Sequence, residues 1–252
     1  MKKRKVKSWI ILVFIFICLV VMIYSLFKII TWKTNVDENH KIKDEIDNSI
    51  KINSSGDSIS YDIDFNTLKA QNKDTIAYIR VNNTNIAYIV VKGKDNEYYL
   101  NHNFEKRSNI AGWIFADYRN RFDTTDKNII IYGHSTKDGS MFGTLKNILK
   151  KDWYENEENH KIILVTETGT YTYQVFSTYT IIPEDYYITT DFVSDDQFNE
   201  FINKLKSRSN YDYKTELLKD DKILTLSSCN IDGSKRIVLH AKLIDEKGTY
   251  GR

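Results

Sequence analysis

An uninterrupted apolar segment near the N-terminus constrains this chain more than any other feature. From Trp9 to Ile30 the sequence reads WIILVFIFICLVVMIYSLFKII, and its one charged residue, Lys28, lies near the end. About 20 residues of helix are needed to cross the hydrocarbon core of a bilayer. We therefore predict a transmembrane helix over residues 9–30, which makes the membrane a partner of this segment.

A cleaved signal peptide is the alternative for this segment. The apolar run is longer than the ~7 to 15 residues of a signal-peptide core, and no A-x-A-like cleavage site follows it. Basic residues precede the span, namely Lys2, Lys3, Arg4, Lys5 and Lys7. Because basic residues stay on the cytoplasmic side of a span, we predict an uncleaved anchor with a cytoplasmic tail over residues 1–8. Everything after Lys33 is then extracytoplasmic.

Charge and motif content argue against two classes of function. The chain has 36 Lys and Arg against 34 Asp and Glu, and five of the basic residues lie in the tail. The external part is therefore slightly acidic, which argues against nucleic acid as a partner. The sequence has no paired cysteines, no H-E-x-x-H and no G-x-x-x-x-G-K, so we expect no metal and no nucleotide cofactor.

Residues 31–60 are predicted to connect the span to the folded domain. Ile42, Ile46 and Ile50 recur at a helical spacing, which indicates a thin amphipathic helix. NSSGDS at 53–58 is typical of a linker. A disordered stalk is the alternative, because so narrow an apolar stripe buries little surface. We place the extracytoplasmic domain at residues 61–252.

The external domain is dominated by short segments rich in β-branched and aromatic residues. Candidate strands cover residues 75–81, 85–91, 112–116, 128–132, 161–167, 170–182, 222–228 and 236–244. Helical patterns occur at 96–101, 140–151 and, most clearly, 194–209, where Ser194 offers an N-terminal cap. We predict a mostly β fold, an eight-stranded closed or nearly closed barrel with N-terminal helices and a long helix before the last two strands.

The two cysteines of the chain cannot pair with each other. Cys18 lies inside the predicted span, whereas Cys229 lies in the external stretch TLSSCNIDGSKRIVLH. An unpaired thiol in an extracytoplasmic domain is a candidate reactive cysteine, and Cys229 follows a predicted strand, where substrate can reach it. The alternative is a small buried residue that only packs. A reactive Cys229 needs a nearby base or cation that favours its thiolate.

His134 and Arg236 are the candidates for that base and that cation. YGHS follows the strand at 128–132, and Gly133 permits a turn that would present the imidazole of His134. Arg236 begins the last strand, a short loop after Cys229, where its guanidinium could stabilise an oxyanion. A hydrogen-bonding role for His134 and a surface position for Arg236 are the alternatives.

Two further residues invite comparison with His134. Asp126 precedes the histidine strand and could orient the imidazole, or it could be a solvated loop acid. His240 lies within the last strand, opposite in parity to the apolar residues. It is therefore predicted to face solvent or a neighbouring strand.

These motifs resemble those of a known enzyme family. TLSSC at 225–229 resembles the TLxTC signature of sortases, the membrane-anchored cysteine transpeptidases of Gram-positive bacteria. YGHS and KRIVLHAKLI resemble the histidine motif and the arginine strand of that family, in the family order of His, Cys and Arg. Residues 75–117 and the helix at 194–209 resemble class B sortases. The resemblance extends from about residue 62 to about residue 245.

The resemblance implies a sortase-type barrel and a thiol-peptidase chemistry without a cofactor. Cys229 would be the nucleophile, His134 the general acid and base, and Arg236 the stabiliser of the oxyanion or substrate carbonyl. The enzyme would cleave the C-terminal sorting signal of a surface protein after threonine and pass the thioacyl intermediate to an amine of a peptidoglycan precursor. The resemblance also implies a substrate groove formed by Asn96, Leu100, Tyr187, Ile188, Ser227, Ser228 and Asn230.

Two positions depart from the family pattern. Ser228 stands where the family has threonine and keeps the hydroxyl group, and Asn230 stands where class B relatives often have an acid. Three other functions stay open: a pilin-polymerising sortase, a hydrolytic cysteine endopeptidase, and a non-catalytic surface binding module in which Cys229 is structural.

Overall fold

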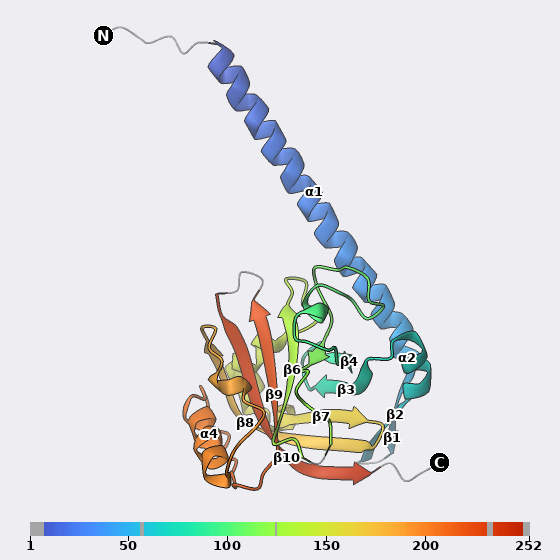
Figure 1. The fold of residues 1–252 in the computed structure, drawn as a ribbon, viewed down its shortest axis with the longest axis vertical. Helices are drawn as coiled ribbons and strands as arrows, with labels where there is room; N and C mark the ends of the chain where they lie inside the picture. Colours follow the sequence, from blue (N-terminus) through green and yellow to red (C-terminus); the bar gives the residue numbers. More distant parts are fainter. Residues whose placement is uncertain (1–7, 56–57, 124, 231–233, 249–252) are drawn as a thin grey trace, which may run out of the picture.

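A long N-terminal helix leaves one end of a β-barrel (Figure 1). The computed structural model describes residues 8–55, 58–123, 125–230 and 234–248. Helix α1 (Ser8–Asp47) is 40 residues long, and the large apolar residues of its first half are exposed. It is the one helix of the described part that is long and apolar enough to cross a membrane, with a mean hydropathy of 3.2 over its most apolar window.

The second half of α1 packs against the barrel domain. Val36, Asn39, Ile42 and Ile46 are buried, so one face of the helix is covered by protein from Val36 onward. Ile42 and Ile46 therefore belong to a docking face of a helix that continues to Asp47, whereas Ile50, the third residue of the predicted stripe, lies in the following strand.

Residues 50–63 differ from the prediction. They form a hairpin of β1 (Ile50–Ser55) and β2 (Ser58–Ile63), in which Ile50 pairs with Ile63. The linker interpretation of 53–58 was therefore wrong for the residues that the structure describes. Its polar composition concealed the two-residue alternation of IKI and ISYDI, which is a strand period.

A closed barrel of eight strands follows the short helix α2 (Phe65–Gln71). The strands are β3 (Thr75–Val81), β4 (Ala87–Val91), β5 (Phe115–Ala116), β6 (Asn128–Ser135), β7 (Lys161–Thr166), β8 (Gly169–Ile181), β9 (Ile223–Asn230) and β10 (Arg236–Gly248). Their order around the barrel is β10-β8-β7-β3-β4-β5-β6-β9. Pairs β4–β5 and β6–β9 are parallel. The predicted eight-stranded barrel is confirmed.

Strand β5 is shorter than the predicted strand at 112–116. Gly112 has a positive φ of 59°, and a Cβ there would lie 2.5 Å from the carbonyl oxygen of Tyr99. The backbone N–H of Trp113 also donates to that carbonyl, at 3.0 Å. Loop contacts therefore replace strand pairing until Phe115.

Helices of different lengths connect the strands. They are η1 (Tyr98–Leu100), η2 (Leu145–Leu149), α3 (Lys151–Glu155), η3 (Glu157–His160), η4 (Tyr186–Ile188) and α4 (Asp195–Ser207). The predicted long helix is confirmed in α4, where the Ser194 side chain accepts a hydrogen bond from the backbone N–H of Gln197 at 3.2 Å. This cap satisfies one of the free donors at the helix start.

Two apolar layers lie on the two faces of the β8-β10-β9 sheet. The barrel interior includes Leu224, Leu226 and Leu239. On the outer face, Phe198, Ile202 and Leu205 of α4 belong to a second cluster with Tyr179 and Val238. This outer face is therefore a second core, and its residues are shielded from water.

The second core explains the position of His240, which is fully buried and does not face solvent. It faces its neighbouring strands: the hydroxyl groups of Tyr179 and Thr225 each lie 2.9 Å from one of its ring nitrogens. Desolvation lowers the pKa of His240 to about 3. The imidazole is therefore neutral at physiological pH and serves as a structural residue.

The pKa of His240 predicts a dependence of stability on pH. The unfolded chain binds a proton near the ordinary value of 6.5 that the folded protein does not bind. The contribution of His240 to the free energy of unfolding is therefore fully present above pH 6.5. Below that value it falls by up to about 1.4 kcal/mol per pH unit, until pH approaches 3. Denaturant unfolding of the detergent-solubilised chain at pH 7.5 and 5.0 should show this loss.

The His240→Gln variant removes the titrating group and should show a smaller difference between the two pH values than the unaltered protein. Val238→Ala lies on the same strand face and also destabilises the second core, but it removes no titratable group. It should lower stability equally at both pH values. An unchanged pH difference in His240→Gln would contradict the assignment.

Candidate active site

Strand register brings the three predicted catalytic residues together. β9 lies between β6 and β10, with Cys229 opposite His134 on one side and opposite Arg236 on the other. Paired residues of neighbouring strands are roughly 5 Å apart and project to the same face of a sheet. His134, Cys229 and Arg236 therefore form one row across three strands, called the catalytic row below. The side chains of Cys229 and Asn230 lie outside what the structure describes.

The catalytic row lies at one end of the barrel. It crosses the C-terminal ends of β6 and β9 and the start of β10. Figure 1 shows that these strand ends point toward the side from which α1 leaves the domain. The next row on the same face consists of Tyr132, Ser227 and Val238.

The turn interpretation placed His134 after strand β6. His134 instead belongs to this strand. Its half-buried imidazole Nε2 lies 2.8 Å from the carbonyl oxygen of Leu100. Since a carbonyl can only accept a hydrogen bond, Nε2 carries a proton. In the neutral ring Nδ1 is then the basic nitrogen.

Gly133 is required for packing rather than for a turn. A Cβ at this position would lie 2.4 Å from Cδ1 of Ile114 and 2.9 Å from Cγ of Phe142, both inside the barrel. The missing side chain lets these two residues approach β6. It therefore helps to hold the backbone beside His134 in place.

Asp126 does not orient His134. It lies before the start of β6, at the opposite end from the imidazole, and it is buried. Its carboxylate accepts hydrogen bonds from the backbone N–H groups of Arg121 at 2.9 Å and Phe122 at 2.6 Å. Asp126 therefore stabilises its own loop, and the carbonyl of Leu100 is the partner of the imidazole.

Arg236 is held in place by a buried tyrosine. Its Nη1 donates to the hydroxyl of Tyr187 at 3.0 Å, and this hydroxyl lies 2.9 Å from Oγ of Ser227. Tyr187 in η4 and Ser227 in β9 are both fully buried. Tyr187 and Ser227 therefore hold the guanidinium of Arg236 from its buried side and are not accessible to solvent.

Asp117, which the sequence analysis did not single out, is the centre of a second polar network. Its fully buried carboxylate accepts hydrogen bonds from Asn96 at 2.9 Å, from Tyr132 at 2.8 Å, and from Nε and Nη2 of Arg119 at 2.8 and 2.7 Å. Burial by itself raises the pKa of Asp117, but these hydrogen bonds together hold it below its ordinary value. The carboxylate is therefore charged.

The Asp117 network joins the loop before Leu100 to helix η4. Nη2 of Arg119 also donates to the carbonyl of Ile188 in η4, at 2.8 Å, and Asn96 belongs to the loop that leads to Leu100. The one sequence signal for this centre was an acidic residue directly after the apolar strand residues of FAD. Such an acid is buried only when it has partners, but the sequence does not identify them.

The predicted groove residues fall into two groups. Leu100 contacts His134, Tyr187 contacts Arg236 and Ser227, and Asn96 and Ile188 are joined to the neighbouring Tyr132 only through Asp117 and Arg119. Ser228 lies on the opposite face of β9, is fully buried, and accepts a hydrogen bond from the backbone N–H of Ile237 at 3.3 Å. The backbone of Asn230 pairs with Ser135. Within the described ranges, no three His, Cys, Asp or Glu side chains come together as metal ligands.

The Asp117 network predicts a strong effect of Asp117→Asn. The amide keeps the shape but loses the charge that Arg119 requires, so we expect a loss of about 2–3 kcal/mol in the free energy of unfolding, after allowing for the partial exposure of Arg119. Asp185→Asn in the exposed start of η4 is the matched control and should change stability by less than about 0.5 kcal/mol. Equal values for the two variants in denaturant unfolding would contradict this role.

Comparison with known proteins agrees with this geometry. The family described as "Sortase domain" matches residues 79–244. The chain is 38% identical to sortase B of Staphylococcus aureus over 184 residues, which is 71% of this chain and 74% of that protein. It is 37% identical to sortase B of Listeria monocytogenes over 182 residues, which is 70% of this chain and 72% of that protein.

Solved structures give the same result. A sortase B from B. anthracis in complex with AAEK1 matches with a TM-score of 0.74 and 34% identity, over 84% of this chain and 99% of that chain. A Staphylococcus aureus sortase B–substrate complex matches with a TM-score of 0.67 and 36% identity, over 72% of this chain and 84% of that chain. These similarities show that this chain belongs to the sortase family, with relatives that are sortases B.

Proposed function

We propose that this chain is a membrane-anchored cysteine transpeptidase that joins surface proteins to the cell wall. It would cleave a C-terminal sorting signal after threonine and transfer the protein to an amine of a peptidoglycan precursor. The observation that carries this proposal is the register of β6, β9 and β10, which aligns His134, Cys229 and Arg236. Its class B relatives support it, and one of them is described as a substrate complex.

The reaction would proceed through a covalent intermediate. The thiolate of Cys229 adds to the carbonyl carbon of the threonine, and the C–N bond to the next residue breaks as protonated His134 gives a proton to the leaving amine. The resulting thioester is then attacked by the acceptor amine, which loses a proton to His134 as the C–S bond breaks. Dividing amide exchange into two acyl transfers keeps the substrate protein attached throughout.

His134 and Arg236 have separate tasks in this scheme. The Leu100 carbonyl holds the Nε2–H of His134, which leaves Nδ1 to accept and return the proton. Arg236 is cationic at every relevant pH, and Tyr187 holds its guanidinium beside the position of Cys229. This cation favours the thiolate before the attack and stabilises the oxyanion that forms during it.

The sorting signal would lie along the walls that flank the catalytic row. Asn96 and Leu100 belong to one wall, Ile188 to the other, and Asn230 follows the nucleophile. We place Tyr187 and Ser227 beneath this groove because they are fully buried. Ser228 is left out of the groove because its side chain faces the barrel interior.

We also propose that the chain is a single-pass protein of the cell membrane. Residues 1–8 form the cytoplasmic tail, 9–30 the span, 31–60 the connecting segment and 61–252 the extracytoplasmic catalytic domain. The length and hydropathy of α1 support the span, and the basic residues before Trp9 support the orientation.

A first experiment tests the covalent step. The full chain in detergent is incubated with a pool of sorting-signal peptides and measured by intact mass. We expect a peptide-sized adduct that hydroxylamine removes and that Cys229→Ala does not form. A glycine peptide added as acceptor should give a ligated product, whereas a hydrolytic endopeptidase would release the same product with or without the amine. A chain that forms no adduct with any peptide, and whose Cys229 thiol also resists alkylation, would be a binding module.

A second experiment tests the support of Arg236. Tyr187→Phe removes the hydroxyl that joins Arg236 to Ser227 but keeps the buried ring, so we expect kcat to fall about tenfold, the effect of one lost hydrogen bond of about 1.4 kcal/mol, with little change in KM. Tyr186→Phe is the matched control, since the Tyr186 hydroxyl contacts Tyr179, at 3.2 Å. Equal kcat values in the two variants would contradict the role of Tyr187.

A further inference from the structure

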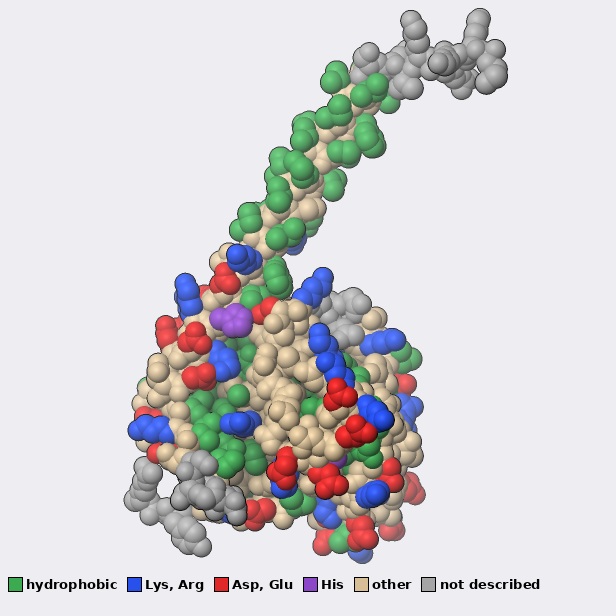
Figure 2. Space-filling view, turned by 180° about the vertical axis from the view of Figure 1, so that it is seen from behind, with side chains coloured by type: hydrophobic (Ala, Val, Ile, Leu, Met, Phe, Trp, Pro, Cys, Tyr) green, Lys and Arg blue, Asp and Glu red, His purple; other side chains and the backbone are tan. Residues whose placement is uncertain are grey.

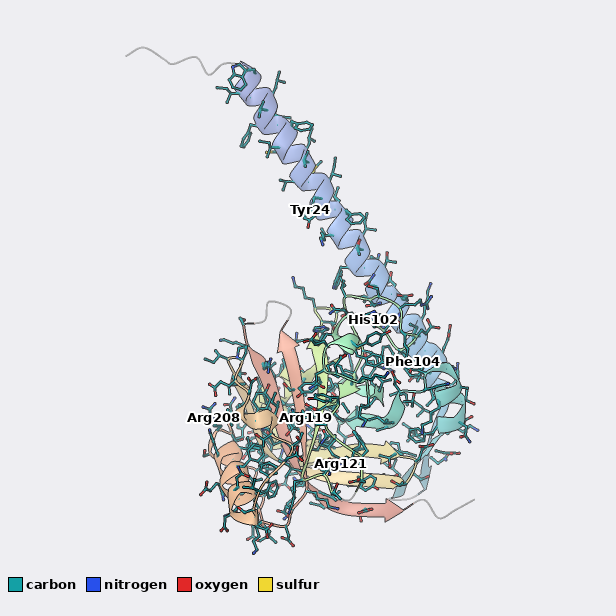
Figure 3. All side chains as sticks on the ribbon, in the orientation of Figure 1. Tyr24, His102, Phe104, Arg119, Arg121 and Arg208 are labelled. Carbon is teal, nitrogen blue, oxygen red and sulfur yellow. The ribbon has the colours of Figure 1, made fainter. Side chains whose placement is uncertain are left out.

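The helix α1 docks at the same end of the barrel that carries the catalytic row. Nε2 of His40 in α1 lies 2.9 Å from Oδ2 of Asp138, and Asp138 lies in the segment between Ser135 and Met141 that directly follows His134. In Figure 3 His102 lies toward the end of the barrel from which α1 leaves, whereas Arg121 lies toward the opposite end.

A second set of contacts holds the first turns of the docked helix. Asn35 accepts a hydrogen bond from the backbone N–H of Ile110 at 2.7 Å, and Asn39 donates to the carbonyl of Gly112 at 3.0 Å. Glu38 lies 3.2 Å from Nε of Arg107. These contacts involve the loop that begins after Leu100, the partner of His134. The direction of α1 is therefore fixed relative to the catalytic row.

The direction of the docked helix is also the direction of its apolar half. No glycine and no proline occurs between Ser8 and Asp47, and these are the usual causes of a sharp kink. At about 1.5 Å per residue, Asn35 lies roughly 7–8 Å beyond Ile30. The headgroup layer of one leaflet is roughly 5–8 Å thick, so Asn35 and its partner Ile110 would lie at its outer boundary.

The surface at this end of the domain suits a lipid headgroup layer. Ile110 is 52% exposed although it is a large apolar residue. Arg107 is exposed three residues before Ile110, and Lys137 and Lys235 are exposed beside the catalytic row in sequence. Arg107 is paired with Glu38 and Glu105, and Asp138 with His40. Figure 2 shows basic side chains on both sides of the base of α1, with acidic side chains between them. An apolar residue among cations is typical of contact with an anionic bilayer surface.

We propose that the barrel end carrying His134, Cys229 and Arg236 rests on the outer surface of the bilayer, with Ile110 and the basic residues around it in the headgroup layer. This inference rests on the proposed membrane span. Cys229 would then meet its substrates within the first layer of water above the lipid. Peptides that are themselves held in the membrane would be preferred over peptides in free solution, because both partners diffuse in one plane.

Site-specific photocrosslinking tests the position of this surface. The full chain is reconstituted in vesicles of phosphatidylglycerol and phosphatidylcholine, with a benzophenone amino acid in place of either Ile110 or Leu218. Leu218 has a similar exposure of 57% but precedes the start of β9, at the opposite end from Cys229. We expect at least tenfold more lipid adduct from position 110. Equal yields from the two positions would overturn the proposal.

Insertions after Lys33, in the exposed part of α1, test the role of the docked helix. Seven helix-forming residues keep the rotational phase and raise the domain by about 10 Å, and seven Gly and Ser residues release its orientation. Both leave every docking contact intact. The helical insertion should abolish the lipid adduct at position 110, and the flexible insertion should reduce it severalfold. Adducts that survive the helical insertion would contradict a surface fixed by α1.

Activity on two substrates separates this inference from the proposed function. One sorting-signal peptide is free in solution, and the other carries a lipid anchor in the same vesicles. Both insertions should leave turnover of the free peptide unchanged and reduce turnover of the anchored peptide at least fivefold. If the unaltered chain turns over neither peptide, the proposed transpeptidase activity is refuted. If the chain does not float with the vesicles, the membrane span is refuted, and this inference with it. Equal effects on both peptides would refute this inference alone.

Discussion

The parallel pairing of β6 with β9 is the interaction on which the rest of the site depends. The two strands are almost a hundred residues apart in sequence, yet their register sets His134 opposite Cys229, and the antiparallel neighbour β10 adds Arg236 to the same row. A shift of one residue in either pairing would turn one side chain to the other face of the sheet. Gly133 protects this register because its missing side chain lets Ile114 and Phe142 pack tightly against β6.

Polar networks hold the surroundings of the row where apolar packing alone would not determine orientation. Asp117 is charged and buried, and it joins the loop of Asn96, strand β6 and, through Arg119, the carbonyl of Ile188. Tyr187 likewise joins η4 to Arg236. A buried charge requires all its partners in place. These networks therefore hold η4 and the loop of Asn96 in place, and α1 docks onto the loop that holds His134 in its orientation.

Local patterns predicted much of this fold, and their failures have physical causes. The strands and α4 were predictable because their apolar residues recur with the period of the element and because Ser194 caps the helix. The hairpin at 50–63 was missed because polar residues concealed its alternation. His240 was assigned partly to solvent because a two-residue period identifies the opposite face of a strand, but not whether another layer covers it. In this protein α4 and η4 cover that face.

The sequence by itself determined the membrane-type segment, the barrel class and the chemical identities of His134, Cys229 and Arg236, because these depend on composition, period and short motifs. Only the tertiary structure decided which residues support them: the carbonyl of Leu100 rather than Asp126 for the histidine, Tyr187 for the arginine, and Asp117 for the walls. Each of these contacts joins segments that meet only when the barrel closes. The spacing of residues along the chain therefore does not predict these contacts. The strand register and the burial of side chains in the folded protein reveal them.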